Sequence, residues 1–419
     1  MQILRKTAVA TALVAAASMG MAFGGTVAAN AATQKTILSQ GGSDTTYFAM
    51  TALTKLYNKG NKTVSVTQIP PNNNTSIGFP ASVTVPADSG CPKTAPWNSN
   101  GSRTWDSSDA AHTPPNGSSA GITALQNDAA SANPGCALDL ARSSRGLGNG
   151  SDTPDLEAYA FALDALSWSV QVGGAHANTV APATLSVSQL QGIYTCGASG
   201  APKFTNWKQV GGKNAPIIKY APQVGSGTIS FFQTALLGGA TVDSGCDAAH
   251  LSHYAEENQA ATRCTNNDPT CLSGFEKIPT KDLSHMIIPF GYANWQAQKN
   301  SAKSGEKDAR NGFVLQKIEG VAPSAKTINE GGLGKPHFLG TRYVYNVLTR
   351  NEPHYAEAAA FAGINQNTHT NGFLCQDSDA AARKKVVAAL KTFGDTPLPD
   401  AVQGSGQPSG YCRFNPTPV

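Results

Sequence analysis

The sequence predicts an α/β protein with two lobes, and three observations support this. Short apolar runs with the character of strands alternate with amphipathic helical segments, the pattern of an α/β architecture with largely parallel strands. A chain of 419 residues is longer than one hydrophobic core usually holds, which favours two lobes. Four turns rich in glycine and hydroxyl side chains stand where predicted strands end or predicted helices begin.

The first 31 residues have the pattern of a secretory signal peptide. Arg5 and Lys6 precede a stretch rich in alanine, valine and methionine that closes on the small residues Ala29 to Ala31. We therefore expect residues 1–31 to be removed and the mature protein to be secreted and extracellular. No cysteine stands at the cleavage site and no later apolar run approaches the ~20 residues of a membrane span, so neither a lipid anchor nor membrane insertion is expected.

The charge pattern argues against a nucleic-acid partner. The net charge is +4 at pH 7, and loss of Arg5 and Lys6 would leave the mature chain close to neutral. No run of lysine and arginine of the kind that binds nucleic acid or acidic lipid occurs in the sequence.

The eight cysteines all follow residue 31, and an even number in a secreted chain favours disulfides. Proximity along the chain favours the pairs Cys91 with Cys136, Cys196 with Cys246, Cys264 with Cys271, and Cys375 with Cys412. A metal site is the alternative, but the sequence contains no Cys-x-x-Cys spacing. We expect neither a metal nor another cofactor.

The predicted elements follow in chain order. Residues 47–57 carry apolar side chains at helical spacing after a turn that offers capping residues. Residues from about 59 to 115 are rich in asparagine, serine, proline and glycine, which predicts a loop-rich insertion. A short helix is expected at 122–127 and a strand at 137–140.

The second half of the pattern continues in the same way. Residues 161–172 form an apolar run that predicts a strand, residues 185–194 predict a helix, and 217–220 predict a short strand that leads into GSGT and another helix. An amphipathic helix is expected at 377–393.

The four hydroxyl-rich turns share one chemistry. They lie at 42–46, 116–121, 141–146 and 225–228. The first backbone N–H groups of a helix lack intrahelical partners, and the helix dipole favours a negative group there. A tetrahedral oxyanion offers almost only acceptor oxygens, so hydroxyl and N–H donors suit it. One such turn is an ordinary helix cap, whereas four together predict an oxyanion site without a metal.

The motifs also resemble a known family. In order they are GGSDTTY, GSSAGI, LDLARSSRG, SVSQLQGIY, FTNWKQVGG, GSGT, PFGYANWQAQKN, VAPSAKTI and TRYVYNVLTR. The sequence resembles the phosphate-binding solute receptors of ABC importers, the PstS type of the periplasmic-binding-protein type II class. The resemblance implies a two-lobed α/β fold with the anion in a cleft between lobes, and an importer permease as a partner.

The resemblance also implies domain boundaries. Lobe one would contain residues 33–160 and 290–419, and lobe two residues 161–289. The two crossing segments would fall near 160–164 and 288–292. Closure of the lobes on the ligand would be a hinge motion.

The candidate binding residues come from the four turns. By resemblance, Ser118, Ser226, Gly227 and Thr228 hold the anion, and Asp44 or Thr45 is the contact from the first loop. The complete candidate set is Ser43, Asp44, Thr45, Thr46, Ser118, Arg142, Ser143, Ser144, Ser226, Gly227 and Thr228.

Two positions depart from the family pattern. Pro222 stands where the family has a binding arginine, and Ser144 stands where it has the carboxylate that accepts the proton of hydrogen phosphate. A site without that carboxylate loses its usual means of rejecting sulfate. Arg142, in preference to Arg145, is expected to supply the positive charge, and Asp44 the acceptor.

The sequence leaves two alternative functions open. One is a secreted phosphatase on the same scaffold, although Gly225-Ser226-Gly227 lacks the G-x-S-x-G pattern of a nucleophile elbow. The other is an extracellular surface or matrix protein that reuses the fold for protein contacts. We expect a binding protein for phosphate or a related oxyanion rather than an enzyme.

Overall fold

The computed structural model describes residues 35–72, 74–75, 78–88, 90–148, 150–223, 225–256, 262–264, 275–332, 334–365, 368, 370–376, 378–401, 407 and 410–416. The predicted signal peptide lies outside these residues, as does Cys271, the expected partner of Cys264. Within the described ranges, no helix has both the length and the apolar character that crossing a bilayer requires.

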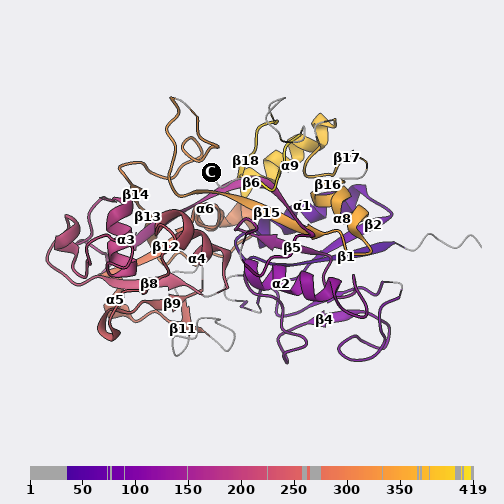
Figure 1. The fold of residues 1–419 in the computed structure, drawn as a ribbon, viewed down its shortest axis with the longest axis horizontal. Helices are drawn as coiled ribbons and strands as arrows, with labels where there is room; N and C mark the ends of the chain where they lie inside the picture. Colours follow the sequence, from indigo (N-terminus) through magenta and orange to yellow (C-terminus); the bar gives the residue numbers. More distant parts are fainter. Residues whose placement is uncertain are drawn as a thin grey trace, which may run out of the picture. The chain divides into compact units, whose positions relative to one another are not determined.

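A mixed sheet forms the centre of the described chain (Figure 1), and the α/β class is confirmed. Its strand order is β2-β1-β5-β15-β6-β12-β8-β9, and β13, β18 and β19 also pair with β6. The strands are β1 (Thr36–Gly42), β2 (Val64–Gln68), β5 (Leu140–Ser143), β6 (Leu156–Gln171), β8 (Ile218–Pro222), β9 (His253–Ala255), β12 (Met286–Gly291), β13 (Phe313–Leu315), β15 (Thr341–Thr349), β18 (Thr396–Pro397) and β19 (Arg413–Phe414).

Strand β6 is shared by both halves of this sheet. Its residues 156–165 pair with β15, and its residues 166–169 pair with β12. The outer pairs β1–β2, β1–β5, β8–β12 and β8–β9 are parallel, as predicted, but every pair that includes β6 is antiparallel. The expectation of largely parallel pairing is therefore wrong for the centre of the sheet, where β12 and β15 return against β6.

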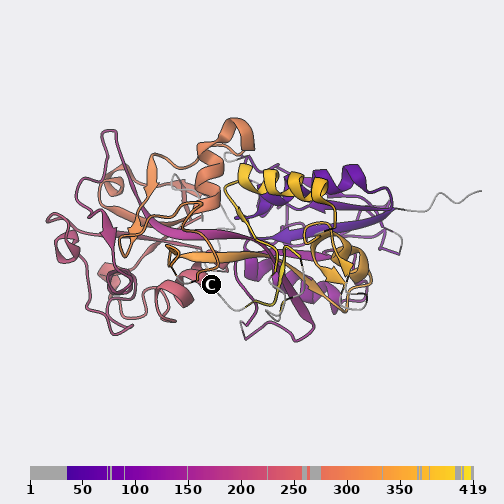
Figure 2. The ribbon, with the colours of Figure 1, turned by 90° about the horizontal axis from the view of Figure 1, so that it is seen from above.

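Helices cover both faces of the half that contains β1, β2 and β5. Helices α1 and α9 pack on each other on one side, and α2 and α8 lie on the other (Figure 2). The helices are α1 (Tyr47–Gly60), α2 (Ser118–Ala129), α3 (Val187–Thr195), η1 (Trp207–Val210), α4 (Gly227–Phe231), η2 (Phe232–Leu236), η3 (Ala248–His250), α5 (Thr280–Leu283), α6 (Tyr292–Lys299), α7 (Ser301–Ser304), α8 (Tyr355–Ala362) and α9 (Ala380–Thr392).

Small two-stranded pairs complete the described secondary structure. They are β3 (Val83–Val85) with β4 (Arg103–Trp105), β7 (Thr184–Leu185) with β14 (Lys317–Ile318), β10 (Thr262–Cys264) with β11 (Phe275–Lys277), and β16 (Ile364–Asn365) with β17 (Thr370–Asn371).

The segment 59–115 is less irregular than its composition predicts. It contains β2, in which Val64, Val66 and Gln68 are buried and alternate with partly exposed residues. Alternation of this kind is the signature of a half-buried strand, and proline and asparagine further along the segment masked it. The rest of the segment is mostly loop around β3 and β4.

Element boundaries differ from the prediction at two places that concern the site. The strand expected at 137–140 begins at Leu140, and Asp139 just before it bonds to Ser39 of β1 through both its backbone N–H and its side chain. Arg142 and Ser143 therefore belong to β5 rather than to a turn. Helix α2 begins at Ser118, four residues earlier than expected.

Three of the four predicted disulfides are confirmed. They join Cys91 to Cys136, Cys196 to Cys246 and Cys375 to Cys412. The first ties the loop-rich segment to the residues that lead into β5.

Candidate functional site

The four hydroxyl-rich turns meet at one place although they are up to 185 residues apart in the sequence. Ser43 follows β1, Ser118 begins α2, Ser144 follows β5, and Gly225 precedes α4. The Ser118 and Ser144 hydroxyls are 3.3 Å apart, Ser118 Oγ also accepts the Ser144 backbone N–H at 2.9 Å, and Ser43 Oγ lies 3.5 Å from Ser144 Oγ. The Ser119 N–H donates to the Gly225 carbonyl at 3.1 Å.

Glycines permit this close approach. A Cβ on Gly227 would lie 2.2 Å from Ser118 Oγ and 2.6 Å from Ser144 Oγ. Gly117 has φ of +99°, and a Cβ there would lie 2.8 Å from the Gly225 carbonyl oxygen. All three distances are shorter than a carbon and an oxygen tolerate, so residues of other types at these positions would force the turns apart.

The GSGT turn begins a helix. Ser226 Oγ accepts the N–H groups of Thr228 and Ile229 at 3.0 and 3.2 Å, which is the bonding of an N-cap. Thr228 has no exposed surface, and its hydroxyl accepts a hydrogen bond of 2.9 Å from Arg342 Nη1. A guanidinium therefore lies directly behind the turn.

Arg342 is a functional candidate that the sequence reasoning missed. It lies on β15, is 2% exposed, and donates through Nε and Nη2 to Asp164 Oδ2 at 3.1 and 2.8 Å. Asp164 Oδ1 accepts the backbone N–H of Ala293 at the start of α6. One sequence signal was available: Arg342 and Asp164 are single charges within otherwise apolar strand-like runs, and buried charges of opposite sign are expected to pair.

A second carboxyl, that of Asp395, is buried near this pair. Its pKa is raised well above the usual range, first by desolvation and then by the negative charge of Asp164, while Arg342 acts in the opposite direction. The surroundings of Asp395 therefore favour the neutral form of its carboxyl group.

Arg142 fastens the first loop to the sheet. Its side chain is fully buried, and Nε, Nη1 and Nη2 donate to the carbonyls of Ser43, Gln40, Gly42 and Ile69 and to the Gln68 side chain. These five bonds use all five N–H donors of a guanidinium. Burial lowers the pKa of Arg142 to about 10 although Tyr47 and Asp44 act in the opposite direction.

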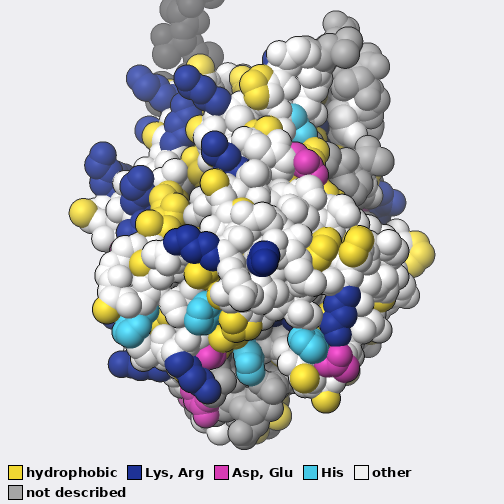
Figure 3. All heavy atoms as spheres, turned by 90° about the vertical axis from the view of Figure 1, so that its left-hand side faces the viewer, with side chains coloured by type: hydrophobic (Ala, Val, Ile, Leu, Met, Phe, Trp, Pro, Cys, Tyr) yellow, Lys and Arg dark blue, Asp and Glu magenta, His cyan; other side chains and the backbone are white. Residues whose placement is uncertain are grey.

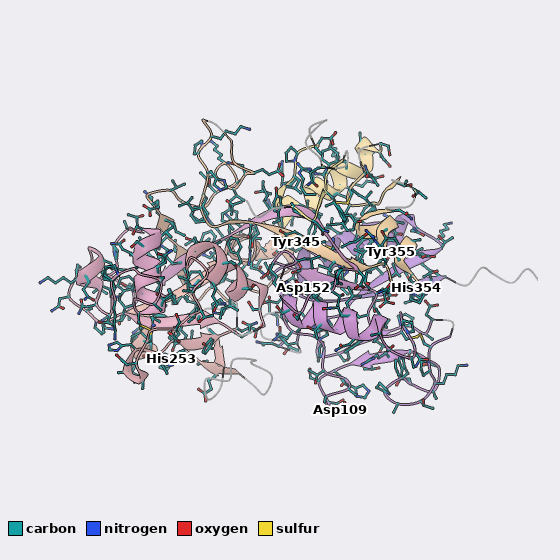
Figure 4. The ribbon with its side chains drawn as sticks, in the orientation of Figure 1. Asp109, Asp152, His253, Tyr345, His354 and Tyr355 are labelled. Atoms are coloured by element: carbon teal, nitrogen blue, oxygen red, sulfur yellow. A yellow bond between two sulfur atoms is a disulfide. The ribbon has the colours of Figure 1, made fainter. Side chains whose placement is uncertain are left out.

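Arg145 and Ser143 also bond within their own turn. Arg145 forms a bidentate pair with Asp152 at 2.8 and 3.0 Å and donates to Ser119 Oγ. Ser143 Oγ donates to the Arg145 carbonyl at 2.7 Å. Ser119 belongs to α2, so the bond from Arg145 to Ser119 ties the turn to that helix, and Asp152 is labelled in Figure 4. In this structure neither Arg142 nor Arg145 extends its guanidinium toward Ser118 and Ser144.

The remaining candidates belong to the first loop. Asp44, Thr45 and Thr46 are 3%, 6% and 0% exposed, and the carbonyls of Asp44 and Thr46 accept the first helical N–H groups of α1. The Thr46 hydroxyl is buried, and no hydrogen-bond partner for it is found among the described residues. It is a donor close to the helix start that an acceptor could satisfy.

The assembled site consists mainly of hydrogen-bond donors. It combines serine and threonine hydroxyls, the beginnings of α1, α2 and α4, and one buried arginine. The Ser118 and Ser144 hydroxyls contact other hydroxyls and a backbone amide, and within the described chain no histidine or carboxylate is bonded to either. This chemistry suits the binding of an oxyanion.

Comparisons with known proteins agree with the fold class. A model described as a PBP superfamily domain matches residues 93–363, more than half of the chain. A search of curated proteins gives no match.

Several solved structures are similar to this chain at low identity. A putative phosphate ABC transporter substrate-binding protein with bound phosphate from Clostridium perfringens is 17% identical, covers 78% of this chain and 93% of its own, and has a TM-score of 0.43. An ABC-type phosphate transport receptor from Vibrio cholerae is 16% identical over 86% of this chain and 100% of its own, with a TM-score of 0.42. PstS from Borrelia burgdorferi is 16% identical over 86% of this chain and 98% of its own, with a TM-score of 0.40.

Proposed function

Because the chain belongs to the PBP superfamily, we propose that it is a secreted solute-binding protein that holds phosphate or a related tetrahedral oxyanion among its four hydroxyl-rich turns. The observation that carries this proposal is the contact of Ser118, Ser144 and Gly227, which come from three separate parts of the sequence. Burying a hydroxyl group costs free energy unless the group is hydrogen-bonded. A cluster of buried hydroxyl groups from distant turns therefore favours a binding role over a purely structural one.

Binding would exchange weak hydrogen bonds for stronger ones. In this structure the Ser43, Ser118 and Ser144 hydroxyls bond to each other, and the turns are closed. A neutral hydrogen bond contributes about 1 kcal/mol net and one to a charged group about 1.5–3 kcal/mol. Four or five such exchanges contribute about 2–10 kcal/mol before the desolvation of the anion is subtracted, a range that includes the ~8 kcal/mol of micromolar affinity.

Arg342 supplies the positive charge in this proposal. The family arginine that resemblance places at Pro222 is absent, whereas the Arg342 guanidinium reaches Thr228 from β15 instead of from β8. Arg142 then positions the first loop, and Asp164 orients Arg342. Ser43, Asp44, Thr45, Thr46, Ser118, Ser143, Ser144, Ser226, Gly227 and Thr228 stay candidates for the site.

Ser118 lies in the predicted lobe one, residues 33–160 and 290–419. Gly227 lies in the predicted lobe two, residues 161–289, so the contact between them joins the two lobes. We propose that these lobes separate about β6, which both halves of the sheet share, so that the anion enters and leaves. Delivery of the anion to an importer permease is the corresponding role in uptake.

Calorimetry on the mature protein tests this function. Titration with phosphate, arsenate and sulfate should give dissociation constants in the micromolar range. Ser144 can donate or accept a hydrogen bond, whereas a carboxylate would only accept one. The affinities for phosphate and sulfate should therefore differ by no more than about tenfold, or 1.4 kcal/mol. Absence of binding by all three anions would overturn the proposal. Hydrolysis of a phosphomonoester that is lost in Ser226→Ala would instead establish the enzymatic alternative.

A further inference from the structure

A buried lysine on β8, the strand that precedes the fourth turn, lies against one of the disulfides. Lys219 Nζ is 3.1 Å from Cys246 Sγ and 3.6 Å from Cys196 Sγ, and it donates to Asp243 Oδ1 at 2.9 Å. Only 6% of Lys219 is exposed. Both sulfurs and one carboxylate are therefore the acceptors around this ammonium group.

The local sequence fixes this arrangement. Lys219 lies on β8, where it is the first of four consecutive buried residues. Cys196 ends α3 in the left-handed conformation, with φ of 51°, which turns its side chain back toward the strand. The turn that carries Cys246 is anchored to α3 independently of the disulfide, because the Asp243 and Gly245 N–H groups donate to the Tyr194 and Thr195 carbonyls at 2.8 and 3.0 Å.

The disulfide is accessible from a cavity. A cavity of about 280 Å³ is lined by Cys196 and Lys219 together with Phe204, His250, His253 and Leu251, among others. His253 is labelled in Figure 4 at the end of the described chain that carries β8 and β9. The face of this end drawn in Figure 3 shows lysine and histidine side chains and few carboxylates, so a thiolate approaching it would not meet a strongly acidic surface.

We propose that Cys196–Cys246 is a site of thiol–disulfide exchange with a dithiol, and that Lys219 makes it the most easily reduced of the three described disulfides. Exchange proceeds through a thiolate, and a leaving sulfur is released faster when a nearby cation stabilises its negative charge. Cys196 faces the cavity, and Cys246 Sγ is the sulfur nearer to the ammonium, so attack on Cys196 releases the sulfur that Lys219 can stabilise.

The reaction balances with the dithiol as the reductant. Its thiolate bonds to Cys196 Sγ as the bond to Cys246 Sγ breaks, and the electron pair of that bond stays on Cys246 as a thiolate facing Lys219. The second thiolate of the reductant then attacks its own mixed-disulfide sulfur and releases the Cys196 thiolate, which takes up a proton. The protein gains two electrons, and the reductant becomes a disulfide.

The other two described disulfides lack this combination. Cys375 and Cys412 are 0% and 1% exposed, so a thiolate has no route to them. Cys91 and Cys136 are partly exposed, but in the described contacts no lysine or arginine donates to their sulfurs. Arg103 lines the same small cavity as both cysteines, so Cys91–Cys136 is an internal control for an exposed disulfide whose sulfurs accept no hydrogen bond from a cation in the described contacts.

Graded reduction of the native protein tests the proposal. The full mature chain is equilibrated with increasing ratios of dithiothreitol to its oxidised form, free thiols are alkylated, and each cysteine pair is quantified by peptide mass spectrometry. Cys196–Cys246 should be reduced at the lowest ratio. If Cys91–Cys136 is reduced at the same ratio or a lower one, the proposal is wrong, and this readout needs no variant.

Substitution of the lysine tests its role separately. In Lys219→Met, half-reduction of Cys196–Cys246 should need a ratio about tenfold higher, the change that one unit in a thiol pKa produces. Lys203→Met is the matched control, because Lys203 pairs with Asp247 in the same region and does not contact the sulfurs. An unchanged midpoint in Lys219→Met, or an equal shift in Lys203→Met, would show that the ammonium does not set the reactivity.

Discussion

Arg342 lies directly opposite Asp164 in the antiparallel pair of β15 and β6, and two of its nitrogens donate to the same carboxylate oxygen. Both side chains are almost completely buried, at 2% and 0% exposure. The pair connects the strand shared by both halves of the sheet to Thr228 at the start of α4, so the position of the anion-binding turn depends on it.

Removing the Arg342 guanidinium should leave the buried Asp164 carboxylate without its positively charged partner. Arg342→Met leaves Asp164 ionised in the interior, and the free energy of unfolding should fall by about 3–5 kcal/mol, as measured by urea denaturation. Phosphate binding should be lost in the same variant because the Thr228 hydroxyl no longer accepts a hydrogen bond from a guanidinium.

A double variant separates the two effects. Arg342→Met combined with Asp164→Asn removes both charges and keeps an acceptor for the Ala293 N–H, so most of the stability should return. Phosphate affinity should not return. Wild-type affinity in the double variant would exclude Arg342 from the site.

A methyl group on Gly227 should block the site. The Cβ of Gly227→Ala would contact the Ser118 and Ser144 hydroxyls at 2.2 and 2.6 Å, so the turns must separate, at a cost of about 1–3 kcal/mol. The rise in melting temperature that phosphate causes should disappear. Gly60→Ala is the control, because a Cβ at Gly60 meets no atom within 4 Å, and it should keep the full phosphate response.

Glu352 should make the protein less stable as pH rises. Burial first, and then the charges of Asp128 and Asp139, raise the pKa of Glu352 to about 9 from 4.5. Since the folded state then holds a proton that the unfolded state has released, stability is greatest below pH 4.5 and declines through the interval up to pH 9. The Gly135 backbone N–H acts in the opposite direction on the pKa of Glu352.

Neutralising this group should remove the decline. At pH 8, Glu352→Gln should be more stable than the wild type by about 1–3 kcal/mol, and at pH 4 the two should be alike. Urea unfolding at several pH values measures this. His354, two residues further along the chain and labelled in Figure 4, donates from Nδ1 to Asp139 Oδ1 at 2.8 Å, and this bond raises the pKa of His354. An equal difference at both pH values would show that the Glu352 proton is not responsible.

Arg142 should act on stability rather than directly on the anion. Arg142→Lys keeps the charge but cannot serve five acceptors on the first loop and β2, so the protein should lose about 3 kcal/mol of stability. Arg310→Lys, at an exposed pair with Asp308, should change stability by less than about 1 kcal/mol. A loss of phosphate affinity without a loss of stability in Arg142→Lys would restore Arg142 as a ligand.

Local patterns were sufficient for the helices α1, α2, α3, α4 and α9 and for the turn chemistry. Ser186 with Gln189 forms a capping box at the start of α3, and Ser226 caps α4, because these bonds involve residues only two or three positions apart. The strand β2 was missed, since its alternating valines lie within a segment whose overall composition indicates loop.

The roles of the arginines illustrate what local patterns do not contain. Arg142 follows a strand-like run beside serines, which is typical of a ligand-binding loop, yet the adjacent strands place five acceptors around it. Arg342 stands in an apolar strand 114 residues from Thr228 and still reaches its hydroxyl.

By itself the sequence determined the α/β class, three disulfide pairs and the hydroxyl-rich character of the turns, because each depends on residue type and short spacing. Tertiary structure alone decided which turns meet, which guanidinium lies behind Thr228 and which disulfide lies against a lysine. Those contacts join residues from different strands, and strand order and register, not proximity along the chain, bring them within bonding distance.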